Sequence, residues 1–317
     1  MPSDSDMMPA RALWITAPRH CELRSEGVAP RHDLVRIHAQ FSGISRGTEG
    51  LVFHGRVPET EYERMRGPNQ AGNLPFPVKY GYAMVGTTDE GRSVFCLHPH
   101  QNVFQLPSEA LATLPQALPP ERAVLAANME TALNVVWDAG VAPGDRVNVF
   151  GAGVVGLLVA HLVSRIPGVD LRVVEISGGR MQVAAALGLE IGTPLENADI
   201  AINASGADAA LTAAIETLGN EGRVVEASWY GDRRATIPLG GAFHSRRLSI
   251  ISSQVGAVAP SHRVRWPYRR RLCKALELLC DPRLDALISG ETAFDDLAEV
   301  YGDIIDDAAT LCHRIRY

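Results

Sequence analysis

Residues 146–156 of the chain read R-V-N-V-F-G-A-G-V-V-G, and this stretch decides the fold. Its apolar start predicts a short buried strand, and the closely spaced glycines that follow predict a tight turn into an apolar helix. A second strand is predicted over residues 171–176, where the acidic Glu175 comes directly after L-R-V-V. Strand, glycine turn, helix and strand in this order predict the first part of a doubly wound parallel sheet.

Each of the three glycines meets a requirement of a phosphate-binding turn. Gly151 permits the sharp bend, Gly153 lets the backbone approach a pyrophosphate, and Gly156 lets helix and strand pack closely. The first helical residues, Val154 and Val155, offer unpaired N–H groups at the positive end of the helix dipole. The pattern predicts a dinucleotide site, and a glycine-rich turn in another kind of α/β protein stays the alternative.

Glu175 decides which dinucleotide is expected. It follows Gly156 at about the 20-residue spacing of a carboxylate that binds a ribose 2′-hydroxyl. The same negative charge repels the 2′-phosphate of NADP, so the sequence favours NAD as the cofactor. Arg180 lies shortly after Glu175 and keeps NADP as the alternative.

Length and composition limit the classes of protein that fit. A chain of 317 residues holds about two domains of roughly 100–200 residues each. The formal net charge of −6 argues against a general role on nucleic acids or on membrane surfaces. No apolar run reaches the ~20 residues that span a bilayer, and residues 1–10 lack the features of a secretory signal, so we expect a disordered leader there. The five scattered cysteines favour a reducing, cytoplasmic location.

The part before the glycine turn has a different pattern. Residues 11–120 consist of short alternating segments separated by Pro and Gly, which predicts a mostly antiparallel β domain. A polar loop over residues 55–77 is a candidate lid. The predicted strands are Ala12–Thr16, His20–Arg24, Leu34–Gln40, Ala83–Thr87, Ser93–Leu97 and Asn102–Leu106.

After a helix predicted over Glu121–Trp137, strands alternate with helices, as in a parallel sheet. Helices are expected at Gly179–Leu187 and Ala207–Leu218, and six strands would complete the doubly wound sheet. These six are Arg146–Phe150, Leu171–Ile176, Leu189–Gly192, Ala198–Asn203, Arg223–Ser228 and Arg247–Ser252. The chain is then expected to continue through a basic loop, a helix over Arg271–Cys280, a short strand near Leu287–Ser289, a helix over Asp295–Asp306 and a strand over Leu311–Ile315.

Several phrases give the chain a family resemblance. They are F-S-G-I-S-R-G-T-E at 41–49, the A-P-G-D run with the glycine turn at 142–156, D-I-A-I-N-A-S-G at 199–206, E-G-R-V-V-E-A-S-W-Y-G at 221–231 and L-I-S-G-E-T-A-F-D-D-L-A-E-V-Y at 287–301. Together they resemble the medium-chain dehydrogenase/reductase superfamily, and within it most closely the branch that contains bacteriochlorophyllide a dehydrogenase.

The resemblance implies an α/β architecture with two kinds of domain. A GroES-like β-rich catalytic domain would cover residues 1–121, and a Rossmann dinucleotide-binding domain would cover residues 122–257. Residues 258–317 would return to complete the catalytic domain. The resemblance also implies a homodimer paired through the outer strand at 247–253, which would hide the unpaired backbone of that edge.

The chain departs from the family's zinc-dependent members at the metal ligands. Ser45 stands where the family has Cys, and Tyr82 and Ala83 stand in place of a His-Glu pair. The third ligand position falls near Ala127, although Glu130 is close to it. A catalytic zinc needs three N, S or O ligands from the protein, so we expect no metal. A shifted zinc site built from His54, His98 or His100 stays the alternative.

Without zinc, another group must polarise a carbonyl or accept an alcohol proton. Tyr82 and Ser45 are the candidates, because the resemblance places both at the metal position; a pocket-lining aromatic and a small filler are the alternatives. His98 and His100 are expected to be satisfied surface histidines, and a proton relay through one of them stays the alternative. The remaining residues that the resemblance assigns to the cofactor are Thr131, Ser205, Gly206 and Arg46, with a solvated ion pair as the alternative for Arg46.

The predicted function is zinc-independent hydride transfer between a nicotinamide cofactor and an alcohol or ketone substrate. Reduction of a conjugated C=C bond, as in quinone-reductase-like proteins, is a second enzymatic alternative. A nucleotide-binding protein without catalytic activity is the alternative from another class. The basic loop at 263–271 could hold an anionic substrate group, but a solvated face is favoured, and no nucleic-acid or membrane partner is expected.

Overall fold

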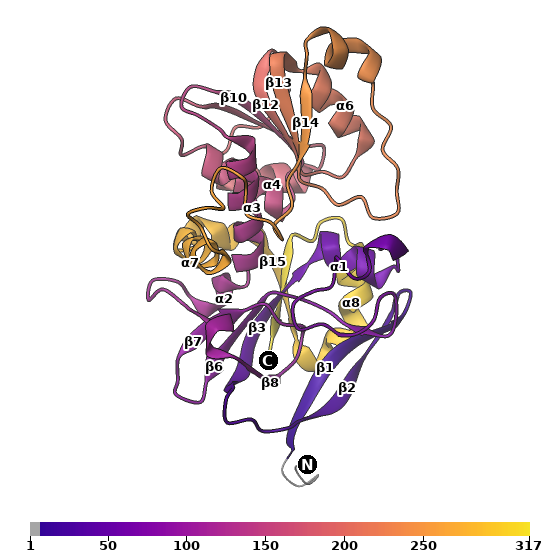
Figure 1. Cartoon of the computed structure of the whole chain (residues 1–317), viewed down its shortest axis with the longest axis vertical. Coiled ribbons are helices and arrows are strands. Elements are labelled where there is room, and N and C mark those ends of the chain that lie inside the picture. The colour runs from indigo at the N-terminus through magenta and orange to yellow at the C-terminus, as the bar shows by residue number, and fades with distance from the viewer. Residues whose placement is uncertain (1–6) are drawn as a thin grey trace. The chain divides into compact units, whose positions relative to one another are not determined.

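A computed structural model describes residues 7–317, and these divide into two compact units (Figure 1). Unit 1 consists of the described residues up to Ala127 together with Leu276–Tyr317, and unit 2 is Asn128–Ala275. The predicted α/β class is confirmed: unit 2 contains a parallel sheet and unit 1 is rich in antiparallel strands. The domain boundaries at 121 and 257 rest on the family resemblance and stay a prediction.

Unit 1 begins with a long antiparallel pair. Strand β1 (Met8–Ala17) pairs with β2 (His20–Val28), so the leader expected over residues 1–10 is wrong from residue 8 onward. The alternating apolar residues of β1 bury one face, including Ala10 and Ala12, and this burial orders the segment. The rest of the expected leader, residues 1–6, lies outside the described residues.

Two sheets make up unit 1. One has the strand order β2-β1-β5-β4, in which β4 (Ala71–Gly72) lies within the predicted loop and β5 (Val78–Lys79) directly follows it. The other has the order β15-β16-β3-β6-β7-β9, with β8 also paired to β3. Its strands are β3 (Val35–Ser45), β6 (Met84–Thr88), β7 (Ser93–Cys96), β8 (Val103–Leu106), β9 (Ala112–Thr113), β15 (Ile288–Ala293) and β16 (Cys312–Arg316).

The end of the chain completes unit 1. Strand β16 pairs antiparallel with β3, and this register sets Cys312 opposite Ser45. Helix α8 (Leu297–Asp306) packs its apolar side against β2 and against α1 (Arg46–Phe53). Strand β16 thus holds the end of β3, and helix α8 holds α1. The candidate residues of unit 1 lie at the junction of β3 and α1.

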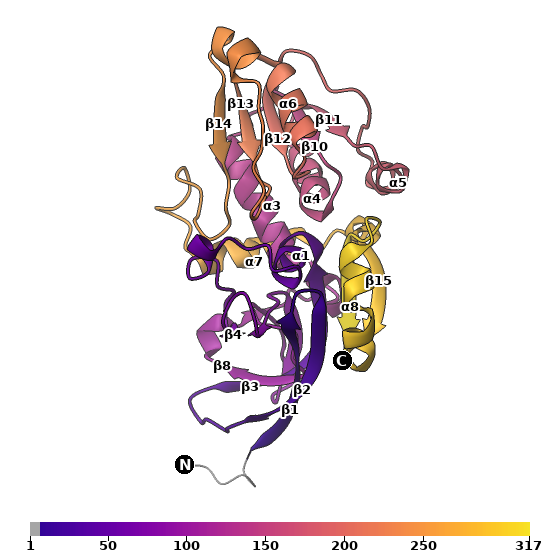
Figure 2. The same cartoon turned by 90° about the vertical axis from the view of Figure 1, so that its right-hand side faces the viewer.

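Unit 2 has a parallel five-stranded sheet in the order β11-β10-β12-β13-β14. Figure 2 shows the sheet with α4 (Val154–Val163) against β10 and β11, and with α6 (Asp208–Glu216) against β12 and β13. The strands are β10 (Arg146–Phe150), β11 (Asp170–Val174), β12 (Ala198–Asn203), β13 (Leu218–Glu226) and β14 (Ser249–Ser252). Strand β14 is an edge strand, as predicted.

The prediction of six strands is wrong by one. Residues 189–192 contribute a single bridge, from Ile191 to Val173. Gly188 has a positive φ of 73°, and Pro194 follows soon after, so the segment is too short to build a ladder. The predicted helix over 121–137 is also divided, into α2 (Pro120–Ala123) and α3 (Ala126–Ala139).

The remaining α-helices of the described residues are α5 (Gly178–Ala186) and α7 (Tyr268–Leu278). The short helices are the π-helical η4 (Leu239–Phe243) and the 3-10 helices η2 (Glu59–Glu61), η3 (Ser108–Ala110), η5 (Pro282–Leu287) and η6 (Phe294–Asp296). The predicted basic loop therefore ends in a helix. Arg271 is buried in that helix, where its guanidinium donates to Glu130, Asn134 and the carbonyl of Val255. Among the described residues, no helix is long and apolar enough to cross a membrane.

Candidate active site

The glycine turn of unit 2 has the packing that its sequence predicts. A Cβ atom on Gly156 would lie 1.9 Å from the carbonyl oxygen of Gly151, so helix α4 can approach β10 only because that atom is absent. Gly151 itself has a positive φ of 97°. A Cβ on Gly153 would meet nothing within 4 Å, which leaves the backbone at the start of α4 open to a ligand.

The position of the turn in the sheet is that of a ligand site. Strand β10 is followed by β11 on one side and by β12 on the other, so the strand order reverses between β10 and β12. Ligands of open α/β sheets bind outside the carboxyl ends of the strands at such a point. Ser205 and Gly206 follow β12 there, and a Cβ on Gly151 would lie 2.8 Å from the Cα of Ser205. The structure therefore brings the predicted phosphate turn and these two residues together.

Glu175 lies just after β11 and closes one side of this turn. Its carboxylate accepts hydrogen bonds from the backbone N–H groups of Ala152, Ile176 and Ser177 at 2.7, 2.7 and 2.9 Å. Burial opposes ionisation, but these donors and the charge of Arg180, 3.9 Å away, outweigh it and lower the pKa of Glu175. An ionised carboxylate thus stands at the end of β11, where the ribose of a dinucleotide is expected.

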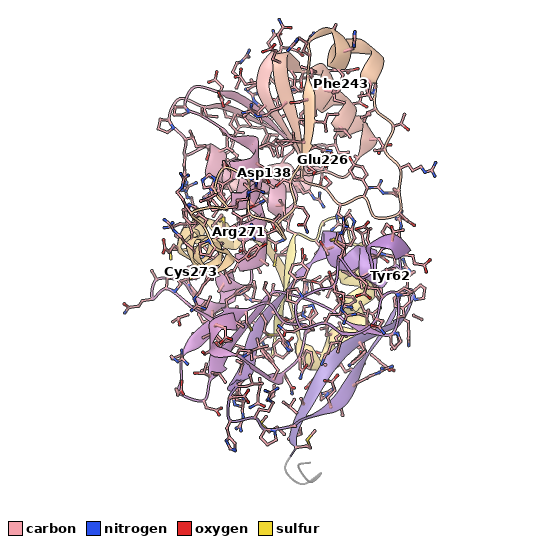
Figure 3. All side chains as sticks on the ribbon, in the orientation of Figure 1. Tyr62, Asp138, Glu226, Phe243, Arg271 and Cys273 are labelled. Carbon is pink, nitrogen blue, oxygen red and sulfur yellow. The ribbon has the colours of Figure 1, made fainter. Side chains whose placement is uncertain are left out.

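A second polar group lies at the carboxyl ends of β12 and β13. Asn203 and Glu226 are the last residues of these strands and stand opposite each other in the ladder, with Nδ2 of Asn203 donating to Glu226 at 2.7 Å. Oε1 of Glu226 also accepts from the N–H of Ser228 at 2.8 Å, and Oε2 accepts from the hydroxyl of Tyr230 at 3.3 Å. Burial raises the pKa of Glu226 despite these donors. Figure 3 labels Glu226 in this position.

The candidate catalytic residues lie in unit 1. The side chains of Ser45 and Thr48, where β3 passes into α1, favour the ionised form of the Tyr82 hydroxyl and so lower its pKa. Burial, together with the negative charge of Glu49, raises the pKa of Tyr82 to about 12, and the two hydroxyls offset only part of the rise. The structure thus brings Tyr82 and Ser45 together and holds the phenol in its neutral form.

A buried network lies beside this group. Glu49 accepts hydrogen bonds from the backbone N–H of Ser45 at 2.7 Å and from the hydroxyl of Tyr301 at 2.8 Å, and its Oε2 lies 2.9 Å from Nε2 of His100. Nδ1 of His100 lies 2.8 Å from the hydroxyl of Ser42. Serine, histidine and acid in this order resemble a nucleophilic triad, but all three side chains are fully buried and Ser42 cannot meet a substrate.

The expectation that His98 and His100 lie on the surface is wrong. Both are buried, and the ring of His98 stacks on Phe104 while its Nδ1 lies 2.9 Å from the carbonyl oxygen of Pro99. Burial lowers the pKa of His98 to about 3, so this ring stays neutral. The sequence reading recognised neither the pair of His100 with Glu49 nor the contact of Thr48 with Tyr82, although Thr48 and Glu49 stand in the phrase S-R-G-T-E.

The groups at the expected zinc positions do not suit the metal. Ser45 and Tyr82 supply a hydroxyl and a neutral phenol, and the methyl groups of Ala83 and Ala127 supply no ligand. Glu130, the alternative third ligand, is engaged with Arg271 at 3.0 Å. Over residues 7–317, no three His, Cys, Asp or Glu side chains gather in a group that could hold a metal ion.

The other cofactor candidates are more dispersed. Val154 and Val155 begin α4, and Thr131 lies within α3. Arg46 begins α1 and belongs to unit 1, whereas the other cofactor candidates belong to unit 2. The assignment of Arg46 and Thr131 to the cofactor stays a prediction.

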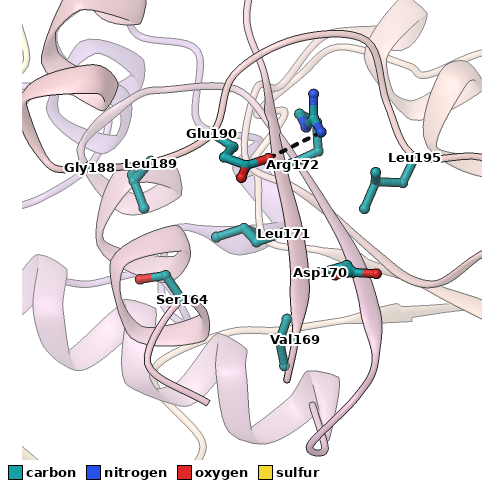
Figure 4. Close-up of a pocket in the computed structure, with 9 residues that line it drawn as sticks. All are labelled: Ser164, Val169, Asp170, Leu171, Arg172, Gly188, Leu189, Glu190 and Leu195. Atoms are coloured by element: carbon teal, nitrogen blue, oxygen red, sulfur yellow. Dashed lines mark hydrogen bonds and ion pairs between the residues drawn. The ribbon is translucent and has the colours of Figure 1, made fainter. Parts of the chain in front are cut away.

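A shallow cleft of about 440 Å³ in unit 2 is unrelated to these groups (Figure 4). It surrounds the first residues of β11, Asp170 and Leu171, and Arg172 pairs with Glu190 across it at 3.2 Å. Asp170 and Leu171 begin β11, whereas Glu175 follows its last residue, so the cleft and Glu175 lie at opposite ends of the strand. The cleft is therefore not the dinucleotide site.

Known proteins with similar sequences are dehydrogenases. The chain is 27% identical to D-xylulose reductase A of Aspergillus niger over 191 residues, which cover 54% of this chain and 51% of the relative. It is 30% identical to (R,R)-butanediol dehydrogenase of Bacillus subtilis over 165 residues, 51% of this chain and 45% of the relative. The matches thus span about half the length of these curated relatives. No family model matches the chain.

The fold matches over nearly the whole chain. An alcohol dehydrogenase from Escherichia coli CFT073, solved in complex with NADH, has a TM-score of 0.76 at 16% identity, and the match covers 98% of this chain and 99% of that one. At this identity the likeness establishes the fold alone. The fold is that of medium-chain dehydrogenases, with a parallel dinucleotide-binding sheet and a separate antiparallel-rich part.

Proposed function

We propose that the chain is an NAD-dependent oxidoreductase of the medium-chain dehydrogenase/reductase superfamily, which transfers hydride between the nicotinamide and an alcohol or ketone without zinc. The observation that carries the proposal is the glycine turn, open at Gly153 and bordered by the ionised Glu175. The relatives named above are a reductase of the keto sugar D-xylulose and a dehydrogenase of butanediol, which supports the substrate class.

The residues of unit 2 fit NAD. The open backbone at Gly153 and the first N–H groups of α4 would receive the pyrophosphate, and Glu175 would accept hydrogen bonds from the adenosine ribose. The ionised Glu175 disfavours a 2′-phosphate, so we propose NAD ahead of NADP. When bound, the nicotinamide supplies the hydride chemistry, and the protein supplies binding, orientation and proton transfer.

We propose that Tyr82 donates a hydrogen bond and then a proton to the substrate oxygen, and that Ser45 and Thr48 orient its hydroxyl. A phenol with a pKa of about 12 stays protonated at neutral pH, which suits a donor in ketone reduction better than a base in alcohol oxidation. The absence of zinc is part of this proposal, and it is supported by the poor ligands at Ser45, Tyr82, Ala83 and Ala127.

The chain resembles the branch that contains bacteriochlorophyllide a dehydrogenase. We therefore propose, as one substrate to test, an alcohol whose hydroxyl group is on a side chain of a large aromatic ring system. The resemblance rests on the phrases S-G-I-S-R-G-T-E and S-R-R-L-S-I-I-S-S-Q-V-G, at residues 42–49 and 245–256. We also propose a homodimer paired through the edge strand β14, and a cytoplasmic location in keeping with the unpaired state of all five cysteines.

Product analysis tests the reaction class. The purified chain with NADH is offered a panel of ketones, including diketones and keto sugars, and a matched panel of conjugated enones. Conversion of ketones to alcohols supports the proposal, whereas saturation of the enone C=C bond with the carbonyl left intact would support the quinone-reductase-like alternative. Tight NADH binding with no turnover on either panel would favour a nucleotide-binding protein without catalytic activity.

A further inference from the structure

Glu226 differs in its partners from three other buried or half-buried acids of the chain. Glu49 contacts His100, Glu130 pairs with Arg271, and Glu175 lies near Arg180. Glu226 accepts hydrogen bonds only from the neutral groups of Asn203, Ser228 and Tyr230, and within the described part of the chain it forms no ion pair. Its negative charge is therefore held in place but not neutralised.

The sheet order places this charge relative to a bound dinucleotide. The ribose on the adenine side belongs at the end of β11 beside Glu175, and the pyrophosphate belongs at the glycine turn after β10. A dinucleotide that crosses the carboxyl edge of the sheet in this direction carries its nicotinamide half onward to the ends of β12 and β13. Glu226 is the last residue of β13 and is half-buried, so its field reaches this part of the crevice.

The two redox states of the nicotinamide differ in charge. The ring of NAD⁺ carries a positive charge, and the ring of NADH is neutral. A fixed carboxylate in a partly desolvated crevice attracts the first and has little effect on the second. Arg233 contacts Tyr230, one of the residues that hold Glu226: its guanidinium lies 5.3 Å from the ring centre of Tyr230 and donates to the carbonyl of Gly206 at 2.6 Å.

We propose that Glu226 is a specificity-determining residue that favours the oxidised over the reduced dinucleotide at this site. The inference rests on the proposed function, because it requires that a nicotinamide dinucleotide binds at the carboxyl edge of the sheet. Asn203, Ser228 and Tyr230 serve as positioning residues that hold the carboxylate.

Equilibrium binding tests the inference without catalysis. The dissociation constants of NAD⁺ and NADH are measured by calorimetry at pH 8 for the native chain and for Glu226→Gln, which keeps the shape and loses the charge. We expect the NAD⁺ constant to rise about fivefold and the NADH constant to change less than twofold. Glu226→Asp keeps the charge and is expected to retain the native ratio.

Glu221→Gln is the matched control, because Glu221 lies on the same strand, is exposed and pairs with Arg247 at 3.1 Å. Equal weakening of both dinucleotides by Glu226→Gln would overturn the inference in favour of a structural role, and an unchanged ratio would overturn it as well. If Glu226→Gln fails to fold, a native ratio of the two constants in Glu226→Asp supports the inference and an altered one overturns it. A native chain that binds neither dinucleotide would overturn the proposed function itself.

Discussion

At the scale of single residues, the chemistry depends on how each polar side chain is partnered. Tyr82 contacts Ser45 and Thr48, and burial beside Glu49 keeps its phenol protonated. Glu175 has the opposite environment, since three backbone donors favour its charge. The same fold thus holds a neutral donor, Tyr82, in unit 1 and an acid whose ionised form is favoured, Glu175, in unit 2, and each suits the role proposed for it.

Removal of one hydroxyl tests the role of Tyr82. If it is the proton donor, Tyr82→Phe should lower kcat for ketone reduction by about 10²–10⁴-fold, because positioned general acids contribute about that much. Affinity for NADH should stay unchanged. Tyr80→Phe is the matched control, since Tyr80 is a buried neighbour whose ring packs edge-on against Tyr82 with centroids 6.2 Å apart. A loss of kcat below threefold in Tyr82→Phe would contradict the role.

Glu175 should make stability depend on pH. Its pKa in the fold is below the ordinary value of 4.5, so its ionised form stabilises the native state. The excess free energy of unfolding of the native chain over Glu175→Gln should be fully present above about pH 5 and should be lost as the pH falls through the lowered pKa. Urea unfolding at pH 3–8 measures this difference, and a difference that stays constant over this range would show that the carboxylate is not stabilised by folding.

At the scale of elements, the glycine turn separates two functions. Gly156 serves the packing of α4 on β10, and Gly153 serves access to the backbone. The two glycines are only three positions apart, yet the surroundings of their missing Cβ atoms differ: one would meet a carbonyl oxygen at 1.9 Å and the other would meet nothing within 4 Å.

Alanine substitutions should therefore have different effects at the two positions. Gly156→Ala forces backbone apart and should cost about 3 kcal/mol of unfolding free energy. Gly153→Ala is compatible with φ of −75° and ψ of 177° and should change stability by less than about 0.5 kcal/mol. We expect it instead to weaken NADH binding at least tenfold, since its methyl group would stand in the approach of the pyrophosphate. Thermal unfolding of both variants measures the loss of stability, and titration with NADH measures the loss of affinity. Equal losses of stability in the two variants would contradict this distinction.

The sequence predicted what depends on local pattern and failed where tertiary contacts decide. The glycine turn and the place of Glu175 directly after a strand follow from spacing, and the structure has both, while their role in binding a dinucleotide stays a prediction. The strand expected over 189–192 did not form, because its apolar residues lie between a left-handed glycine and a proline. His98 and His100 were placed on the surface because no periodicity reveals that partners distant in sequence, Glu49 for His100, bury them. Glu226 was missed for the same reason, since its partner Asn203 lies on another strand.

At the scale of the whole molecule, each unit carries its own share of the proposed function. Unit 2 ends its parallel sheet at β14, whose outer side has no strand partner among the described residues. The unpaired backbone N–H and C=O groups of such an edge can pair with those of an identical strand across a two-fold axis. The assembly and the chemistry can be tested separately.

The dimer proposal predicts a mass near twice the 34.2 kDa of one chain in light scattering at micromolar concentration. The N–H of Ser253 donates to Glu226 of β13, so the N–H of its neighbour Ser252 faces the outer edge. Replacing Ser252, the last residue of β14, with Pro removes this outward donor and should shift the mass to that of a monomer if pairing runs through this edge. Circular dichroism shows whether the variant is folded. A native mass of one chain at all concentrations would contradict the proposal.

The proposed hydride transfer runs without zinc, and removal of metal from the protein checks this. The chain is dialysed exhaustively against a strong chelator, its zinc content is confirmed to be below one-tenth of an equivalent, and its rate of ketone reduction by NADH is compared with that of the untreated protein. We predict equal rates, and no increase when zinc is added back. A rate that is lost on chelation and restored by zinc would contradict the claim.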